Sequence, residues 1–430
     1  MRIKALFLGL AVAAFAVLQQ SAGAQATVAA LPATWLLSVS SSGHQANSYE
    51  YDRATISADG RFVVFDSYAT NLVPSDTNNQ LDVFVRDRQT RLTTLVSVAT
   101  NGAQGNGMSY YPIISADNRY VLFISYASNL VPGDTNGVAD VFVRDLQNRT
   151  TTRVSVSTGG GQGNGDSGPG GISADGRYVG FGSWSSNLVR GDTNNTFDAF
   201  VRDMKTGTTS RVSLSSSGVQ ANGASAVVGV SSDGRYITME SDATNLVPGD
   251  TNGVSDVFVK DRLTGATTRV DVSSKGHQAN AASFRPVVSS DGRYIAFTSD
   301  ATNLVPGGTQ TRDIYIRDRL LGTTRRVVHN SDDPAISGNG RFVAFDSNDS
   351  TLAPGTNGQI DVFVWDGATN RIDLVSRSSA DVPGNGISLL PAVDGTGRYI
   401  AFESEATNLV LTYVTSTEQV FLRDQGLPLP

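Results

Sequence analysis

Short runs of apolar and β-branched residues alternate with turn-forming residues along almost the whole chain. Around residue 233 four runs follow one another, SAVVGVS, RYITMES, DVFVKD and TTRVDVS, with Gly, Asn and Asp between them. This pattern predicts four β-strands, and the Asp-Gly pair between the first two runs is a strong signal for a tight hairpin. In runs such as RYIAF, apolar side chains fall on both faces of the strand, which predicts sheets covered on both sides.

The four-run unit is repeated along the chain. Its hairpin turn recurs at Asp59, Asp117, Asp175, Asp233, Asp291, Asn339 and Thr396, with spacings of 58, 58, 58, 58, 48 and 57 residues. A shortened loop after the fifth unit accounts for the spacing of 48. Seven four-stranded units of this length predict an all-β fold, a seven-bladed β-propeller with four antiparallel strands per blade.

The two ends of the repeat array predict how the ring closes. A fourth run of the TTRVSVS type follows each of the first six units, but the seventh unit stops at VFLRDQGLPLP. The missing run appears at the other end of the chain, as TWLLSVS from Thr34. We therefore expect the N-terminal strand to complete the last blade, which would remove an exposed sheet edge.

The first 26 residues have the pattern of a secretory signal peptide. A basic start, MRIK, precedes the apolar run ALFLGLAVAAFAVL, and Ala24-Gln25-Ala26 has small residues where a signal peptidase reads them. The run is shorter than the ~20 residues that a membrane-spanning helix needs. We therefore expect a signal peptide at 1–26, a single propeller domain at 27–430 and no membrane span, in an exported protein that is periplasmic or extracellular.

Charge and cysteine content narrow the expected partners. The formal net charge of −7 becomes −9 once Arg2 and Lys4 leave with the signal peptide. Nucleic acid is not an expected partner, because phosphate binding needs a basic surface. The chain has no cysteine, so it has no disulfide, and a chain of this length can bury a core without one. We expect a monomer that binds a protein or a carbohydrate.

The segments SxDGRYIAF and DVFVRD resemble the TolB-like, WD-type propeller repeats of bacterial envelope and secreted proteins. The resemblance extends over nearly all of the mature chain. It implies the propeller fold and a general tendency to bind partners. TolB itself has an additional N-terminal α/β domain for which this sequence shows no pattern, so TolB's role in the Tol–Pal envelope system is not implied.

An acidic loop reading Asp-Thr-Asn-x-x-x-Asp separates the second and third runs of units one to four. Its carboxylates and amides are Asp76, Asn78, Asp82, Asp134, Asn136, Asp140, Asp192, Asn194, Asp198, Asp250, Asn252 and Asp256. Such oxygens suit Ca²⁺, which takes about six to eight ligands, so one interpretation is a calcium site in each of blades 1–4. The other is a turn copied by duplication, because Asp and Asn bond nearby backbone and favour turns without metal.

Chain direction alternates along a blade, so the acidic loops should share one face with the inter-blade loops of the type SSGVQANGAS. We expect this loop face, around one mouth of the central channel, to carry function, since loops on a rigid scaffold usually do. Trp184 stands where other units have Tyr68, Tyr126, Asp242 and Asp300, and packing is one explanation for it. Recurrent amides before the acidic loop are expected to anchor loops, not ligands: Asn71, Asn129, Asn187, Asn245, Asn303 and Asn408.

No catalytic constellation stands out in the sequence. The segment GDSGPGG resembles a serine-protease motif, but Ser167 occupies a position that is serine in most units, and nucleophilic catalysis needs a base within reach. The three histidines, His44, His277 and His329, fall in different units.

The predicted function is a non-catalytic binding or scaffold propeller, with Ca²⁺ in blades 1–4 under the first interpretation of the acidic loops. The alternative is a carbohydrate-active or other hydrolytic enzyme with its site at the channel mouth. Converging carboxylates with a strongly raised pKa would favour the enzyme. An aromatic or apolar patch on the loop face would favour a protein partner.

Overall fold

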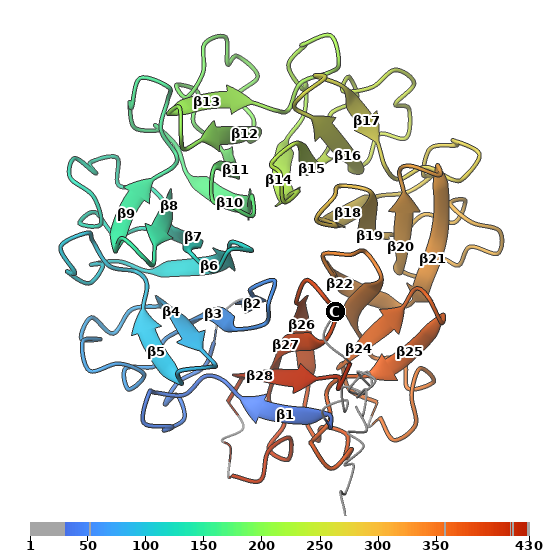
Figure 1. The fold of residues 1–430 in the computed structure, drawn as a ribbon. Coiled ribbons are helices and arrows are strands. Elements are labelled where there is room, and N and C mark those ends of the chain that lie inside the picture. Colours follow the sequence, from blue (N-terminus) through green and yellow to red (C-terminus); the bar gives the residue numbers. More distant parts are fainter. Residues whose placement is uncertain (1–30, 51–52, 357, 413, 415–416, 428–430) are drawn as a thin grey trace, which may run out of the picture.

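Seven four-stranded antiparallel sheets form a ring in the computed structural model, which describes residues 31–50, 53–356, 358–412, 414 and 417–427. Each sheet is one blade, with its first strand near the ring axis and its fourth strand at the rim (Figure 1). The described residues form strands and turns and contain no helix, hence none of a length and apolarity suited to crossing a membrane. The predicted fold class is confirmed.

The first three strands of most blades are six residues long and the fourth is shorter. Blades 1 to 3 consist of β2 (Thr55–Ile56), β3 (Phe62–Ser67), β4 (Asp82–Asp87), β5 (Leu92–Leu95); β6 (Ser109–Ile114), β7 (Tyr120–Ser125), β8 (Asp140–Asp145), β9 (Thr150–Arg153); β10 (Ser167–Ile172), β11 (Tyr178–Ser183), β12 (Asp198–Asp203), β13 (Thr208–Arg211). Blades 4 and 5 consist of β14 (Ser225–Val230), β15 (Tyr236–Ser241), β16 (Asp256–Asp261), β17 (Thr267–Arg269); β18 (Ser283–Val288), β19 (Tyr294–Ser299), β20 (Asp313–Asp318), β21 (Thr323–His329). Blades 6 and 7 consist of β22 (Ser331–Ile336), β23 (Phe342–Ser347), β24 (Asp361–Asp366), β25 (Arg371–Leu374); β26 (Ser388–Val393), β27 (Tyr399–Ser404), β28 (Gln419–Asp424), β1 (Ala33–Leu36).

The N-terminal strand β1 completes blade 7, as predicted. It pairs antiparallel with β28, in a register that sets Thr34 opposite Arg423 and Trp35 opposite Leu422. This pairing joins the two ends of the repeat array and covers the edge of the last sheet. The predicted signal peptide at 1–26 lies outside the described residues.

The hydrophobic core is divided into seven clusters, and each cluster lies between two neighbouring blades. Between blades 1 and 2, for example, Val64 and Val85 pack against Val121 and Phe123. Blade 7 packs against blade 1 in the same way, with Leu422 beside Phe65. Because each sheet faces a neighbour on both sides, its strands carry apolar residues on both faces, which explains the run RYIAF.

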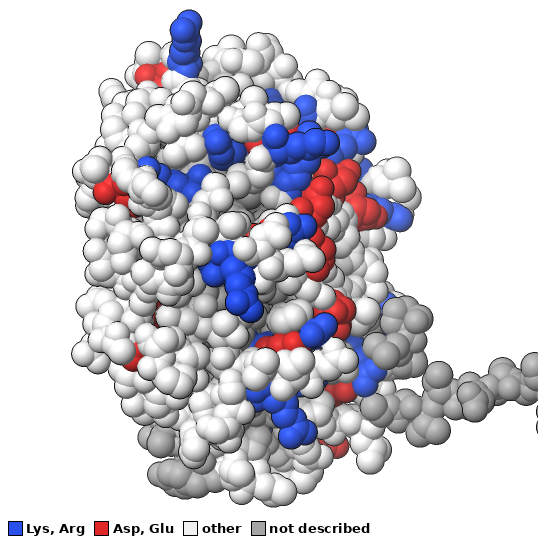
Figure 2. Space-filling model, turned by 60° about the vertical axis from the view of Figure 1, so that its left-hand side comes forward, with Lys and Arg blue, Asp and Glu red and all other residues white. Residues whose placement is uncertain are grey.

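The two faces of the ring differ in chemistry. The turn face carries the hairpin turns between strands 1 and 2 and between strands 3 and 4, and there an arginine after the first turn pairs with the aspartate that ends the third strand, as Arg177 does with Asp203 at 2.9 Å. The loop face carries the strand 2–3 loops and the inter-blade loops. Figure 2 shows the charged side chains gathered mainly along one side of the visible surface, and most of the rest is uncharged.

Candidate functional site

The acidic loop of a blade is held by the loop that leads to the next blade. In blade 1 the Gln104 amide donates to Asp76 Oδ1 and to Asp82 Oδ2, both at 2.9 Å, and its oxygen accepts the Thr77 N–H at 3.0 Å. The Asn78 amide donates to a backbone carbonyl of the same inter-blade loop at 2.9 Å. The two kinds of loop therefore share one face, as predicted.

These loops lie over the outer half of each blade and not around the ring axis. Asp82 accepts a hydrogen bond from Ser97, which follows the rim strand β5, and Asp140 accepts one from Arg153 of the rim strand β9. The expectation that the acidic loops surround the channel mouth is therefore corrected. The reason is that the chain passes from the second to the third strand in the middle of the blade. The acidic loop then makes its hydrogen bonds with residues at the rim, in or after the fourth strand.

In blades 2 to 4 an arginine of the fourth strand lies between the two aspartates of the acidic loop. Arg153 Nη1 is 3.1 Å from Asp134 Oδ1 and 3.0 Å from Asp140 Oδ2. The arrangement recurs in blades 3 and 4, in Arg211 with Asp192 and Asp198 at 3.3 and 3.7 Å, and in Arg269 with Asp250 and Asp256 at 3.0 and 3.5 Å.

Blade 1 lacks this arginine. Leu95 of β5 stands at the position of Arg153, so the neutral amide of Gln104 is what bridges Asp76 and Asp82. Burial raises the pKa of Asp82 to about 6. The acidic loop of blade 1 therefore differs in charge from the other three.

The donor set fits Ca²⁺ in part. The two aspartates of each loop face a common bridging group, but the amide nitrogens of the four asparagines donate to backbone carbonyls, in Asn78, Asn136, Asn194 and Asn252. Throughout the described ranges, no three His, Cys, Asp or Glu side chains are grouped as a metal ion would require. Calcium binding by the twelve residues stays a prediction.

The asparagines that precede the acidic loops anchor the inter-blade loops, as predicted. Asn71 Oδ1 accepts the Asn47 N–H at 3.0 Å, and the Asn71 amide donates to the Gln45 carbonyl at 2.8 Å. Equivalent bonds are made by Asn129, Asn187, Asn245, Asn303 and Asn408.

Ser167 of the GDSGPGG segment has a packing role. Its hydroxyl is 2.8 Å from the Ser183 hydroxyl across β10 and β11, and it is buried. The same serine pair recurs in blades 2, 4, 5 and 7. The interpretation of this segment as a copied structural feature is confirmed.

Aromatic rings that are exposed or partly exposed gather on the loop face of blades 1 to 3. Trp184 is 58% exposed, and Tyr126, at the same position of blade 2, is 48% exposed. Rings of the same blade make contact, with centroids 6.3 Å apart for Tyr110 and Tyr126 and 5.6 Å apart for Trp184 and Phe197. We call this set the aromatic arc: Tyr49, Tyr68, Tyr110, Tyr111, Tyr126, Trp184 and Phe197.

Glycines hold the rings of blade 3 in place. A Cβ on Gly165 would come within 3.1 Å of the Trp184 Cβ, so the Gly165 backbone packs closely against the backbone and Cβ of Trp184. A Cβ on Gly182 would come within 2.2 Å of the Phe197 ring, which occupies the space that a side chain has at the same strand position in other blades, such as Asp66 and Glu240. Trp184 is therefore not a core residue but an exposed ring on a shaped support.

The other half of the ring carries an ion-pair network near the axis. Arg53 of blade 1 reaches Asp333 of blade 6 at 2.8 Å, and Arg285 of blade 5 contacts both Asp332 and Asp333, at 3.0 and 2.8 Å. Burial, and then the charge of Asp333, raises the pKa of nearby Asp346 to about 7. Sequence reasoning missed this network, because its residues come from units that are far apart in the chain.

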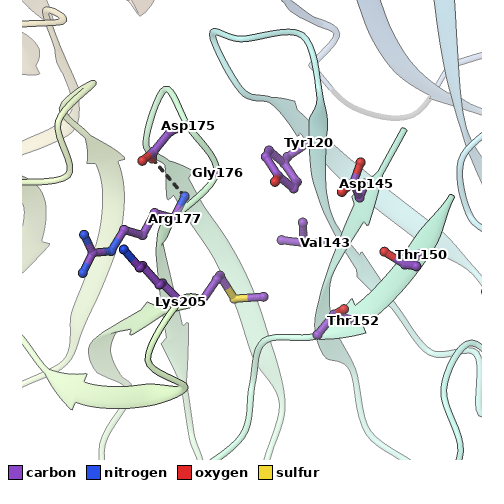
Figure 3. Close-up of a pocket in the computed structure, with 10 residues that line it drawn as sticks. Tyr120, Val143, Asp145, Thr150, Thr152, Asp175, Gly176, Arg177 and Lys205 are labelled. Atoms are coloured by element: carbon purple, nitrogen blue, oxygen red, sulfur yellow. Dashed lines mark hydrogen bonds between the residues drawn. The ribbon is translucent and has the colours of Figure 1, made fainter. Parts of the chain in front are cut away.

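A cavity of about 370 Å³ opens on the turn face between blades 2 and 3 (Figure 3). Three of its four charged side chains are already engaged within the fold, and Lys205 is the fourth. Arg177 and Asp145 pair with charges of their own blades at 2.9 and 2.7 Å, and Asp175 accepts the Arg177 N–H at 3.0 Å. Tyr120 packs over Gly176, where a Cβ would come within 2.1 Å of the ring. This cavity is a gap between packed turns and offers a ligand little free chemistry.

Comparison with known proteins shows the fold and leaves the function open. No family model matches the chain, and no curated protein does. Similar solved structures include an oligogalacturonate lyase from Vibrio parahaemolyticus, with 12% identity, 88% of this chain and 90% of that chain covered, and a TM-score of 0.53. The propeller domain of the trilobed protease from Pyrococcus furiosus has 12% identity, covers 88% and 98%, and has a TM-score of 0.53. TolB from Acinetobacter baumannii has 14% identity, covers 86% and 81%, and has a TM-score of 0.39.

Proposed function

We propose that this protein is an exported, non-catalytic binding propeller whose loop face binds a partner protein. The aromatic arc is the observation that carries the proposal. Exposed rings that are held rigidly lose little conformational freedom on binding and supply a large contact area, which is why aromatic residues dominate protein interfaces. The signal-peptide pattern at 1–26 supports export.

The arc is tested by removing rings from the middle of it. Immobilised mature protein is exposed to envelope and secreted fractions of the producing cells. The double variant Tyr111→Ser, Tyr126→Ser is expected to retain at least tenfold less partner than the parent. The loss of two aromatic anchors should cost about 2–4 kcal/mol. Retained proteins are quantified by mass spectrometry.

The matched control removes exposed apolar side chains from the turn face. Leu263→Ser with Leu320→Ser changes residues that are 76% and 74% exposed in strand 3–4 turns. This variant should retain the partner as the parent does. Equal retention by all three proteins would refute the proposal.

A hydrolytic enzyme is the second candidate, because of Asp346. Asp346 has a pKa near 7 and lies beside Asp332 and Asp333, which are paired with arginines. Hydrolysis uses such a combination, in which one carboxyl serves as the acid and another as the base. Turnover of a polysaccharide or glycoside panel that Asp346→Asn abolishes would replace the binding proposal with this one.

The predicted calcium sites differ between blades in how readily Ca²⁺ should bind. In blades 2–4 a Ca²⁺ ion would compete with an arginine, whereas in blade 1 it would displace only the Gln104 amide. We expect Ca²⁺, and not Mg²⁺, to raise the melting temperature, since a ligand at a hundredfold excess over Kd stabilises by about 2.7 kcal/mol. Asp76→Asn should abolish the rise and Asp192→Asn should leave it intact. An unchanged melting temperature in millimolar Ca²⁺ would identify the acidic loops as structural turns.

A further inference from the structure

A pocket of about 350 Å³ lies at the end of the aromatic arc, between blades 3 and 4. The Trp184–Phe197 pair forms one wall, and Glu240 and Asp242 of blade 4 stand on the other side. Serine hydroxyls complete the lining, in Ser225, Ser241 and Ser255. The pocket therefore combines an exposed aromatic face with two carboxylates.

No lysine or arginine is among the residues that line this pocket. The pocket thus carries two formal negative charges without an internal counterion. Glu240 accepts the Arg285 backbone N–H at 3.1 Å, which orients its carboxylate but adds no positive charge. The side chain of Arg285 is engaged elsewhere, with Asp332 and Asp333.

The other two tryptophans of the chain are each covered by an arginine. The guanidinium carbon of Arg88 lies 5.3 Å from the Trp35 ring centroid, and that of Arg325 lies 4.8 Å from the Trp365 ring centroid. Among the described residues, no cation lies over Trp184. The electron-rich face of an indole attracts cations, so this fold supplies one at two of its tryptophans and leaves the third face open.

The combination of ring and carboxylates is confined to one blade junction. At the corresponding positions between blades 2 and 3, Tyr126 is followed by Gly182 and Trp184, which bring no carboxylate. Between blades 6 and 7, the acids Glu403 and Glu405 are present, but Asn348 replaces the aromatic ring. The pocket is thus not a general product of the repeat.

We propose that this pocket binds the guanidinium or ammonium group of an arginine or lysine side chain of the partner protein, stacked on Trp184 and paired with Glu240 and Asp242. The inference rests on the proposed function, because the pocket is the end of the arc to which we assign the partner. The formal charge of the chain, −7, or −9 without Arg2 and Lys4, also favours a basic partner.

The probe is an acetylated and amidated Gly-Gly-Arg-Gly-Gly peptide, with citrulline in place of arginine as the uncharged counterpart. Binding to ¹⁵N-labelled mature protein is followed by the indole N–H resonance of Trp184. We expect the arginine peptide to bind at least tenfold more tightly than the citrulline peptide, and added salt to reduce that ratio.

Three variants separate the contributions of ring and charge. Trp184→Leu, which keeps an apolar surface but removes the ring, and the double variant Glu240→Gln, Asp242→Asn should each weaken the arginine peptide at least tenfold. Asp300→Asn, at the position of Asp242 one blade further on, should leave its affinity unchanged. All four changed residues lie at the surface or are partly exposed, so the variants should fold, which far-ultraviolet circular dichroism checks.

Equal binding of both peptides, or full binding by the carboxylate variant, would overturn the proposal. Maltotetraose and cellotetraose are titrated in parallel, and binding of a neutral saccharide without the arginine peptide would assign the pocket to sugars instead. If the double variant of the aromatic arc loses its partner, but the parent binds the arginine and citrulline peptides equally, only this inference fails. If the arginine peptide binds as expected and no partner depends on the arc, the proposed function fails and the pocket assignment stands.

Discussion

Deletion of residues 27–40 from the mature protein is expected to destabilise it by about 5 kcal/mol and to expose a sheet edge that promotes association. The deleted segment contains β1 and Leu37, which is buried in the cluster that also includes Leu422. Burial of such a side chain contributes about 1.5–3 kcal/mol, and the backbone bonds between β1 and β28 are lost as well.

A buried arginine adds to this cost. Arg423 is fully buried, and its guanidinium donates to the Thr34 hydroxyl at 3.1 Å and to the Ser378 carbonyl at 2.8 Å. Without β1, the guanidinium loses its Thr34 hydroxyl partner. The free edge of β28 then presents unpaired N–H and C=O groups, which is the usual cause of strand-to-strand association.

A circular permutant is the matched control for the deletion. The permutant begins after residue 47. Behind Asp424 it continues with the turn sequence RQTR, copied from residues 88–91 of blade 1, and then with residues 33–47. Blade 7 then has the connectivity of the other six blades, so we expect near-parental stability in urea unfolding and a monomer in light scattering. A truncated protein as stable and as monomeric as the parent would show that β1 does not close the ring in solution.

Asp271→Ser is expected to stabilise the protein at pH 8 by about 2 kcal/mol, through a hydrogen bond to a charged group that the present side chain cannot make when ionised. Asp271 is fully buried beside Asp256. Burial, and then the charge of Asp256, raises the pKa of Asp271 well above its ordinary value. Its Oδ2 has no hydrogen-bond partner within the described residues.

The corresponding residue in four other blades is a serine that donates to the first aspartate of the third strand. The donor–acceptor distances are 2.5 to 2.7 Å, in Ser97 to Asp82, Ser155 to Asp140, Ser213 to Asp198 and Ser376 to Asp361. A serine can make this bond at any pH. An aspartate can donate it only while protonated, so blade 4 lacks the bond once Asp271 ionises.

The pH dependence has a definite sign. A carboxyl whose folded pKa is raised binds its proton more tightly in the native state, so the free energy of unfolding falls as pH rises from the unfolded pKa towards the folded one. The gain from Asp271→Ser should therefore be small at pH 4 and largest above the folded pKa. Ser213→Asp in blade 3 is the reciprocal control and should destabilise at pH 8. Equal stability of the parent and Asp271→Ser at pH 8 would contradict the argument.

Much of the fold follows from residues that are close together in the chain. The Asp-Gly hairpins, the spacing of 58 and the displaced strand TWLLSVS predicted seven blades and the closure by β1 correctly. Backbone conformation at a turn and apolar periodicity along a strand are local properties, so they can be read from short segments.

The candidate site was predicted less well. The column Tyr68, Tyr126 and Trp184 can be recognised in the repeat, but the exposure of Trp184 cannot, because it depends on how Gly165 packs against it and how Phe197 packs over Gly182. The acidic loops were recognised as loops, yet the arginine between their aspartates comes from the fourth strand, as Arg153 does for Asp134 and Asp140. Pairings of this kind are set by the register of neighbouring strands.

By itself, the sequence determined the repeat, the number of blades, the closing strand and the face on which the loops gather, because each follows from local backbone preference and a fixed period. Only the tertiary structure decided which residues of different blades meet: the Arg53–Asp333 pair across blades 1 and 6, and the Trp184 ring opposite Glu240 and Asp242. Those contacts depend on how the blades pack against one another. Packing brings together side chains that no short-range pattern in the chain connects.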